Sequence, residues 1–257
     1  MNDNYVALMN VAARIARNAG DLVFVGRRNG AGNVQTKSSA TDMVTQWDTA
    51  SEQFILKQLG LLRPHDSIVG EEGTQIKGSS PFTWFVDPID GTTNFLYNLS
   101  GYAVSIAACL GTDPVAAAVF LPATRELFVA AKGHGAWLGS TPLHVSPCES
   151  LETALVATGF SYSSTRRETQ GQRVARLLPR VRDIRRCGAA AADLCFVACG
   201  RIDAYFEEGL QPWDLAAGQL IAAEAGAVAS NFSGGPIIPS EVVVTTPRIH
   251  SSLISSL

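Results

Sequence analysis

The chain has 257 residues, of which 46% are hydrophobic and 17% charged, and its formal net charge is −3. This composition excludes a disordered or fibrous protein, and the slight acidic excess argues against a general nucleic-acid binder. The length predicts either one large domain or two small ones that share an interface.

Neither a membrane span nor a disulfide framework is expected. The apolar stretches, such as 103–110 and 115–121, are interrupted by Gly or Pro and fall short of the roughly 18 residues that a spanning helix needs. The start of the chain lacks the basic segment and apolar core of a secretory signal. The five cysteines are odd in number, and Cys195 and Cys199, one helical turn apart, are predicted to be buried apolar side chains and not half of a metal site. We therefore expect a cytoplasmic protein.

The first half of the chain predicts two helices followed by an antiparallel meander. Apolar residues at helical spacing from Leu8 to Leu22 indicate the first helix, and a Gly- and Asn-rich loop or ragged hairpin is expected over 27–39. A second helix is expected to begin near 41–45 and to end at Leu62. Strand-like runs follow at 67–69, 83–86, 104–110, 115–121, 126–131 and 136–138.

The second half mixes helices and strands. Strands are expected at 155–158, 203–206 and 242–245, and helices at 166–178, 189–199 and 213–225. The elements come in clusters and not in strict β-α-β alternation. This order indicates an α/β sandwich in two lobes, with a weak boundary near 142–149.

Acidic residues lie at the ends of apolar runs in three places. Gly70-Glu71-Glu72-Gly73 and Asp87-Pro88-Ile89-Asp90 each follow a predicted strand, and Trp213-Asp214 begins a helix. Side chains in such positions on a rigid scaffold are typical of functional sites. Asp87 and Asp90 are close enough to repel each other unless a cation lies between them. Because these ligands are hard oxygens without convergent His or Cys, they favour Mg²⁺ or Mn²⁺ over Zn²⁺.

Each segment also has a plainer interpretation. Asp90-Gly91 between apolar runs is the commonest hairpin signal, although it also fits the beginning of a helix whose free N–H groups would hold an anion. Glu71-Glu72 alone fits a solvated loop, and Asp214 alone fits a helix N-terminus. Taken together, the three segments favour a metal-dependent enzyme that handles phosphate, since bound metals neutralise phosphate oxygens and activate water.

Longer motifs add a resemblance to a known family. The strings WFVDPIDGTTNF over 84–95 and WDLAAGQLIAAEAG over 213–226 resemble the two signatures of the inositol monophosphatase family. The earlier motifs of that family are matched in order and spacing by Gly70-Glu71-Glu72 and by Lys37-Ser38-Ser39, Asp42, Thr45 and Asp48. The resemblance implies an α+β fold, a layered αβαβα sandwich of the inositol monophosphatase/fructose-1,6-bisphosphatase type. We accordingly expect residues 1–257 to form a single catalytic unit, with an N-terminal lobe of about 1–145 and a C-terminal lobe of about 146–257.

The resemblance also implies two or three Mg²⁺ ions, with Mn²⁺ as a substitute. Glu71, Asp87 and the Ile89 carbonyl would hold the first ion, and Asp87, Asp90 and Asp214 the second. Glu71 would share a third, weaker ion with waters. Gly91 and Thr92 would offer N–H groups to the phosphate, and the Thr92 hydroxyl, paired with Asp48, would orient the attacking water. Lys37 and Asp42 match motif positions near the site and are given a supporting electrostatic role.

Substrate contacts are implied on the C-terminal lobe. Asp90 and Glu207 match positions that bind inositol hydroxyls, and Glu207 is chemically suited to accept hydrogen bonds from a polyol. Ala190 lies in the segment 188–191, which matches the wall of the sugar pocket. Many relatives have Ser or Thr at Ala189 or Ala190, so one hydroxyl contact would be missing here. Ser161 is a further candidate that equally fits a turn serine.

These residues predict an Mg²⁺-dependent phosphatase acting on inositol monophosphate by direct attack of a metal-activated water. The resemblance implies a lithium-sensitive homodimer, and we expect no nucleic-acid or membrane partner. Alternative substrates are histidinol phosphate, fructose 1,6-bisphosphate and 3′-phosphoadenosine phosphate, and a non-catalytic binding protein on the same fold is a further alternative.

A bisphosphate or adenosine substrate would need a basic or aromatic subsite near 160–190. Arg166-Arg167 and Arg185-Arg186 lie there, although a solvent-exposed or interface role is favoured for both pairs. Trp84, Trp137 and Trp213 are predicted to be core or packing residues and not a stacking platform.

Overall fold

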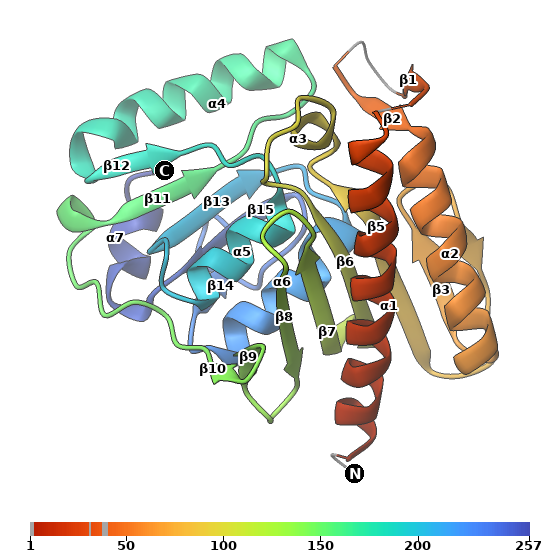
Figure 1. Ribbon diagram of the computed structural model, residues 1–257. Coiled ribbons are helices and arrows are strands. Elements are labelled where there is room, and N and C mark those ends of the chain that lie inside the picture. The colour runs from red at the N-terminus through yellow and green to blue at the C-terminus, as the bar shows by residue number, and fades with distance from the viewer. Residues whose placement is uncertain (1–2, 31, 38–40) are drawn as a thin grey trace.

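The computed structural model describes residues 3–30, 32–37 and 41–257. Helices and sheets alternate in five layers (Figure 1). Helices α1 (Asp3–Arg28) and α2 (Gln46–Leu62) cover one face of an eight-stranded sheet, and α5 (Ala190–Ala198) and α6 (Pro212–Glu224) lie between this sheet and a second, five-stranded sheet. On the outer face of the second sheet pack α4 (Ser164–Leu177) and α7 (His250–Ile254). The predicted αβαβα sandwich is confirmed.

The larger sheet has the order β10-β9-β8-β7-β6-β5-β3-β4, and only its β3–β5 pair is parallel. Its strands are β3 (Ser67–Gly70), β4 (Gln75–Ile76), β5 (Phe82–Asp90), β6 (Ala103–Leu110), β7 (Asp113–Leu121), β8 (Glu126–Ala131), β9 (Ala136–Leu138) and β10 (Thr141–Pro142). The expected meander is confirmed from β6 to β9, because successive strands pair with their neighbours in the chain.

The smaller sheet has the order β12-β11-β13-β15-β14, with β11 parallel to both of its neighbours. Its strands are β11 (Leu155–Thr158), β12 (Asp183–Arg185), β13 (Ala204–Glu208), β14 (Val228–Ser230) and β15 (Glu241–Thr245). Single turns of 3₁₀ helix occur at Leu151–Thr153, Leu178–Arg180 and Pro247–Ile249. The short helix α3 (Thr92–Leu96) follows β5 directly.

Strand β6 shows why the middle of the chain is so apolar. Val104, Ile106 and Ala108 pack against the layer of α1 and α2, while the alternate residues Ala103 and Ala107 pack toward α5 and α6. Since side chains alternate along a strand, a strand covered on both faces needs apolar residues throughout. The apolar stretch of the sequence over β6 is therefore a strand between two helical layers. None of the described helices is long and apolar enough to cross a membrane.

The segment predicted as a loop or ragged hairpin over 27–39 is partly helix and partly hairpin. Helix α1 continues to Arg28, and the Arg27 side chain donates a 2.6 Å hydrogen bond to the Phe95 carbonyl, which fixes the last turn. Strand β1 (Val34–Thr36) then pairs with β2 (Met43–Thr45) in an antiparallel hairpin. Ser38 and Ser39 of the early motif lie outside the described residues. The prediction missed β4, β10, β12, β14 and α7, which are too short to show a periodic pattern.

The three tryptophans differ in their environments. Trp84 is fully buried in β5, and its indole N–H donates a 2.9 Å hydrogen bond to Asp66, as expected for a core residue. Trp213 is half-buried at the start of α6. Trp137 is 37% exposed, because β9 lies next to the sheet edge, so of the two predicted roles it is not a core residue. All five cysteines are free thiols, and Cys195 is fully buried.

Candidate active site

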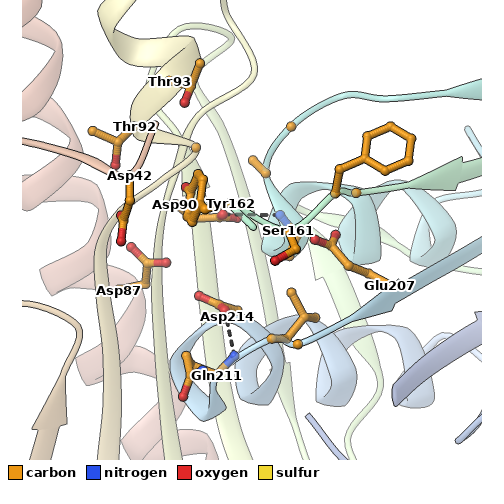
Figure 2. Close-up of a pocket in the computed structure, with 18 of the residues that line it drawn as sticks. Asp42, Asp87, Asp90, Thr92, Thr93, Ser161, Tyr162, Glu207, Gln211 and Asp214 are labelled. Atoms are coloured by element: carbon orange, nitrogen blue, oxygen red, sulfur yellow. Dashed lines mark hydrogen bonds between the residues drawn. The ribbon is translucent and has the colours of Figure 1, made fainter. Parts of the chain in front are cut away.

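A pocket of about 370 Å³ opens between the two halves of the chain (Figure 2). Its lining includes eleven of the predicted site residues, namely Lys37, Asp42, Glu71, Asp87, Asp90, Gly91, Thr92, Ser161, Ala190, Glu207 and Asp214. Two predicted residues, Asp48 and Ile89, do not line the pocket and are buried behind it. Residues from 37 to 214 thus meet in one place.

A bulge at the end of β5 turns Asp87 and Asp90 toward the same side. Asp87 pairs with Ser105 of β6, whereas Asp90 pairs with Ala103, so three residues on β5 span only two on β6. In a regular strand, residues three apart point to opposite faces. The extra residue restores the same face for both carboxylates, as expected for a bulge beside a site. Pro88 is tolerated inside this strand because the bulge leaves the ladder interrupted.

Gly91 turns the chain from β5 into α3, so Asp90-Gly91 begins a helix and not a hairpin. Its φ of 86° lies in the left-handed region, which glycine adopts without strain. A Cβ at Gly91 would also lie 2.9 Å from the Gly101 carbonyl and 3.0 Å from the Gly188 carbonyl. Backbone segments that are far apart in the sequence therefore approach closely at this residue.

Thr92 and Asp48 form a buried hydrogen-bonded pair behind the pocket. The Thr92 hydroxyl lies 3.1 Å from Asp48 Oδ1 and 3.0 Å from the Ile89 carbonyl, so its single proton has two acceptors. Asp48 in turn accepts a 2.8 Å hydrogen bond from the Thr45 N–H and completes the capping box of α2. Burial raises the pKa of Asp48, although its hydrogen bonds with Thr45 oppose the shift.

Asp90 connects the end of β5 to the start of α5. Its two carboxylate oxygens accept hydrogen bonds of 3.2 Å from the Ala190 N–H and 2.7 Å from the Ala191 N–H, at the start of α5. Asn94 adds a 2.7 Å hydrogen bond to the Cys187 carbonyl. The N-terminus of α5 lacks a side-chain cap of its own, so Asp90 satisfies free N–H groups there from 100 residues away.

Asp214 and Glu71 have protein partners as well. Asp214 accepts a 2.7 Å hydrogen bond from the Gln211 N–H, drawn as a dashed line in Figure 2. Glu71 accepts 2.9 Å and Glu72 2.6 Å hydrogen bonds from the Lys37 ammonium group. Burial opposes the charge on Lys37, but these two carboxylates outweigh it and raise the pKa of Lys37. Lys37 therefore supplies part of the positive charge at the site.

The pocket carries far more negative than positive groups. Its acidic lining residues are Asp42, Glu71, Asp87, Asp90, Asp193, Glu207, Glu208 and Asp214, against the two basic residues Lys37 and Arg186. Burial raises the pKa of Asp87 and of Asp214 well above the usual range, and neighbouring carboxylates add to both shifts. Burial likewise raises the pKa of Asp90 to about 7. Such a cluster is stabilised by bound cations.

The donor set fits Mg²⁺ by charge and by chemistry, since hard carboxylate oxygens are its preferred protein ligands. Among the residues that the structure describes, no three His, Cys, Asp or Glu side chains are already arranged as a metal-binding group. Instead, Glu71, Asp90 and Asp214 accept hydrogen bonds from the protein. An ion at this site would have to compete with Lys37 for Glu71.

The raised pKa values predict how stability depends on pH. The usual pKa of an aspartic acid is about 4, whereas that of Asp90 is about 7 in the folded chain. Between these values the folded state binds more protons than the unfolded state, so the free energy of unfolding falls as pH rises. Without metal, we therefore expect the Tm to fall between about pH 4 and pH 7, as measured by differential scanning calorimetry in EDTA.

Mg²⁺ should reverse this loss, since it binds the ionised carboxylates of the folded state. At 100 times its Kd, a ligand stabilises by about 2.7 kcal/mol, or roughly 5–10 °C for a chain of this size. We expect this increase in Tm at pH 8 and a smaller one at pH 5.5. An equal increase at both pH values would contradict the assignment of these carboxylates to a cation site.

The sequence interpretation missed several pocket residues on the second lobe. Arg186 lines the pocket, although a solvent-exposed or interface role was favoured for it, whereas the exposed Arg166 and Arg167 do not line it. Asp193 and Tyr162 also line the pocket. Nothing in the local pattern marked Asp193, because a single acid in the Ala-rich α5 is equally typical of a helix N-terminus.

Comparison with known proteins decides the family. The sequence profile described as "Inositol monophosphatase family" matches residues 4–257. This chain belongs to the inositol monophosphatase family. Inositol-1-monophosphatase SuhB of Mycobacterium tuberculosis is 44% identical over 97% of this chain and 93% of its own length. The structure of the extragenic suppressor protein suhB from Bartonella henselae superposes with a TM-score of 0.92, at 35% identity, over 97% of this chain and 98% of that one.

One relative in this family carries a different name. Nus factor SuhB of Escherichia coli is 35% identical over 97% of this chain and 95% of its own length. Members of the inositol monophosphatase family at this level of similarity are therefore named both as phosphatases and as a Nus factor. Membership in the inositol monophosphatase family therefore supports a phosphatase, but it does not by itself identify the substrate.

Proposed function

We propose that this chain is an Mg²⁺-dependent phosphomonoesterase that hydrolyses inositol monophosphate to inositol and phosphate. The observation that carries the proposal is the convergence of Glu71, Asp87, Asp90 and Asp214 on one pocket beside the Thr92–Asp48 pair. Membership in the inositol monophosphatase family supports the same chemistry. Both lobes would act as a single catalytic unit, since the pocket draws residues from each.

The carboxylates of the pocket would hold the metal ions. Glu71, Asp87 and the Ile89 carbonyl would bind one Mg²⁺, and Asp87, Asp90 and Asp214 would bind another. When bound, Mg²⁺ neutralises phosphate oxygens, lowers the pKa of a bound water and stabilises the leaving oxygen. Mn²⁺ would substitute because it takes the same hard oxygen ligands.

Thr92 and Asp48 would orient the attacking water. The Thr92 Oγ1 lies 3.1 Å from Asp48 Oδ1, so the hydroxyl proton can point to the carboxylate while a lone pair accepts a hydrogen bond from water. The backbone N–H groups of Gly91 and Thr92, at the start of α3, would then bind phosphate oxygens. Lys37 would offset negative charge beside Glu71, which it contacts directly.

The second lobe would bind the alcohol part of the substrate. Glu207 lines the pocket and would accept hydrogen bonds from hydroxyl groups, with Ser161 nearby on the same wall (Figure 2). Ala190 would shape the wall through its methyl group, because its N–H already donates to Asp90. The homodimeric state, cytoplasmic location and lithium sensitivity stay predictions, as does the absence of a nucleic-acid partner.

Phosphate release across a panel of substrates tests the proposal. Purified protein would be assayed with Mg²⁺ on inositol 1-phosphate, histidinol phosphate, fructose 1,6-bisphosphate and 3′-phosphoadenosine phosphate, with EDTA as the control. We expect the highest kcat/KM with inositol 1-phosphate and no release in EDTA. A higher kcat/KM with another substrate would overturn the substrate assignment alone. No release from any substrate would contradict phosphatase activity.

One observation keeps a bisphosphate substrate in that panel. Arg186, Phe160 and Tyr162 line the pocket, and together they provide the basic and aromatic groups that a bisphosphate or an adenosine would need. The charge of Arg186 already acts on two neighbouring acids, Asp193 and Glu207. These acids offset the positive charge that a second phosphate group would need, which weighs against a bisphosphate. Inositol monophosphate therefore remains the better fit.

A further inference from the structure

The pocket contains a buried carboxylate that the proposed metal chemistry does not use. Asp193 lies in the first turn of α5, lines the pocket and is 1% exposed. Its Oδ1 has no hydrogen-bond partner; among buried side chains in the described part of the chain, only Gln170 Nε2 shares that condition. An unsatisfied buried acceptor destabilises the fold, and a charged one does so more strongly. Because Asp193 also lines the pocket, a bound ligand can supply the missing donor.

The neighbours of Asp193 hold it in place without satisfying this oxygen. The Cys187 thiol forms a hydrogen bond with the Asp193 carboxyl group, and the positive charge of Arg186 acts on it. Burial outweighs both effects and raises the pKa of Asp193 to about 7. Above pH 7 the ionised carboxylate accepts hydrogen bonds but donates none, so its free oxygen suits a ligand hydroxyl.

Glu207 is fixed near Asp193. The Tyr205 hydroxyl donates a hydrogen bond to Glu207 Oε2, and the negative charge of Glu207 acts on Asp193. Gly159 makes room for this arrangement, because a Cβ at that position would lie 1.8 Å from Glu207 Oε2. The charge of Arg186 acts on both acids, so the three side chains form one group on this wall of the pocket.

We propose that Asp193 is a substrate-recognition residue, which works with Glu207 to bind neighbouring hydroxyl groups at the non-phosphorylated end of the substrate. The inference rests on the proposed function, and it adds a second acceptor to the one expected at Glu207. Two fixed acceptors match a cyclic polyol, which presents hydroxyl groups on adjacent carbons. A phosphate ester without hydroxyl groups gains nothing from Asp193.

The test compares two substrates in one variant. Loss of a hydrogen bond to a charged group is worth about 1.5–3 kcal/mol, so Asp193→Ala should raise the KM for inositol 1-phosphate roughly 10- to 150-fold. For p-nitrophenyl phosphate, which has no hydroxyl groups, kcat and KM should stay within about 3-fold. Asp193→Asn keeps one carbonyl acceptor and should give an intermediate KM. Alanine is compatible with α5, which already contains several alanines.

A binding measurement provides a readout that is independent of turnover. Inositol, the uncharged product, would be titrated calorimetrically into the protein in the presence of Mg²⁺, and Asp193→Ala should weaken its affinity by the same factor as KM. Asp66→Ala is the matched control, since Asp66 is a buried acid outside the pocket that bonds to Trp84 and Ser80. This control should lower the Tm without changing the ratio of the two KM values.

Each outcome decides the role of Asp193. Equal losses with both substrates, or no loss with either, would show that Asp193 is structural and would overturn the inference. If the wild type prefers another sugar phosphate, only the substrate assignment fails, and the same comparison is made with that sugar phosphate. If the wild type hydrolyses nothing, the proposed function fails, and unchanged binding in Asp193→Ala would overturn the recognition role separately.

Discussion

Asp90→Asn should lower kcat/KM for phosphate release by about 10³-fold or more. The substitution removes one negative charge from the centre of the proposed metal site. It also disturbs the contact between lobes, because Asp90 accepts hydrogen bonds from Ala190 and Ala191 with both oxygens. An asparagine would turn its NH₂ group toward one of these N–H donors. Steady-state kinetics with saturating Mg²⁺ would measure the loss.

A matched control separates this effect from a general loss of charge. Asp113→Asn removes the charge of an exposed aspartate at the start of β7, where it pairs with Lys132. We expect its kcat/KM to stay within about 2-fold of the wild type, because an exposed ion pair contributes little. Unchanged phosphate release in Asp90→Asn would rule out a metal-binding role for Asp90.

Trp84→Ala should lower the free energy of unfolding by about 3–5 kcal/mol, the range for a fully buried aromatic side chain. Trp84 packs between β5 and the helical layer of α1 and α2, so its removal leaves a cavity in the core. The substitution also removes the 2.9 Å hydrogen bond to Asp66. Chemical denaturation followed by circular dichroism would measure the loss.

Trp84→Phe is the control for this prediction. It keeps most of the buried volume and loses the hydrogen bond, so we expect a smaller cost of about 1–2 kcal/mol. KM for the preferred substrate should stay close to that of the wild type in Trp84→Phe, since Trp84 does not line the pocket. A cost below about 1 kcal/mol for Trp84→Ala would contradict its place in the core.

Local sequence pattern predicted the elements that are long enough to show a period. Helix α2, the meander from β6 to β9 and helix α6 lie close to their expected bounds. Strands of two or three residues, such as β4 and β12, contain too few side chains for alternation to be visible. The end of α1 was missed because Arg27 and Arg28 begin the polar, Gly- and Asn-rich stretch 27–39, whereas the Arg27 side chain donates a hydrogen bond to the distant Phe95 carbonyl.

The site residues likewise divide into those that sequence motifs predicted and those that they did not. Asp87, Asp90 and Asp214 stand in long motifs, so their meeting in one pocket was expected, and the pocket contains all three. Asp193 stands in no motif that indicated binding, and Arg186 was considered only as part of a basic pair that a bisphosphate or adenosine substrate would need. Their roles depend on contact with Glu207, which the chain brings near only when β13 packs beside α5.

The sequence by itself determined the chemical groups that are available: hard oxygen ligands, an Asp-Gly-Thr segment at the end of an apolar run, and a largely apolar chain with a slight acidic excess. These properties depend on residue types and on local spacing, which a single chain displays directly. Only the tertiary structure decided that a bulge turns Asp87 and Asp90 to the same side and that Asp90 caps α5 across 100 residues. It also decided that Asp193 keeps an unpaired oxygen. Such features arise from strand register and from the packing of distant segments, and no local pattern encodes either.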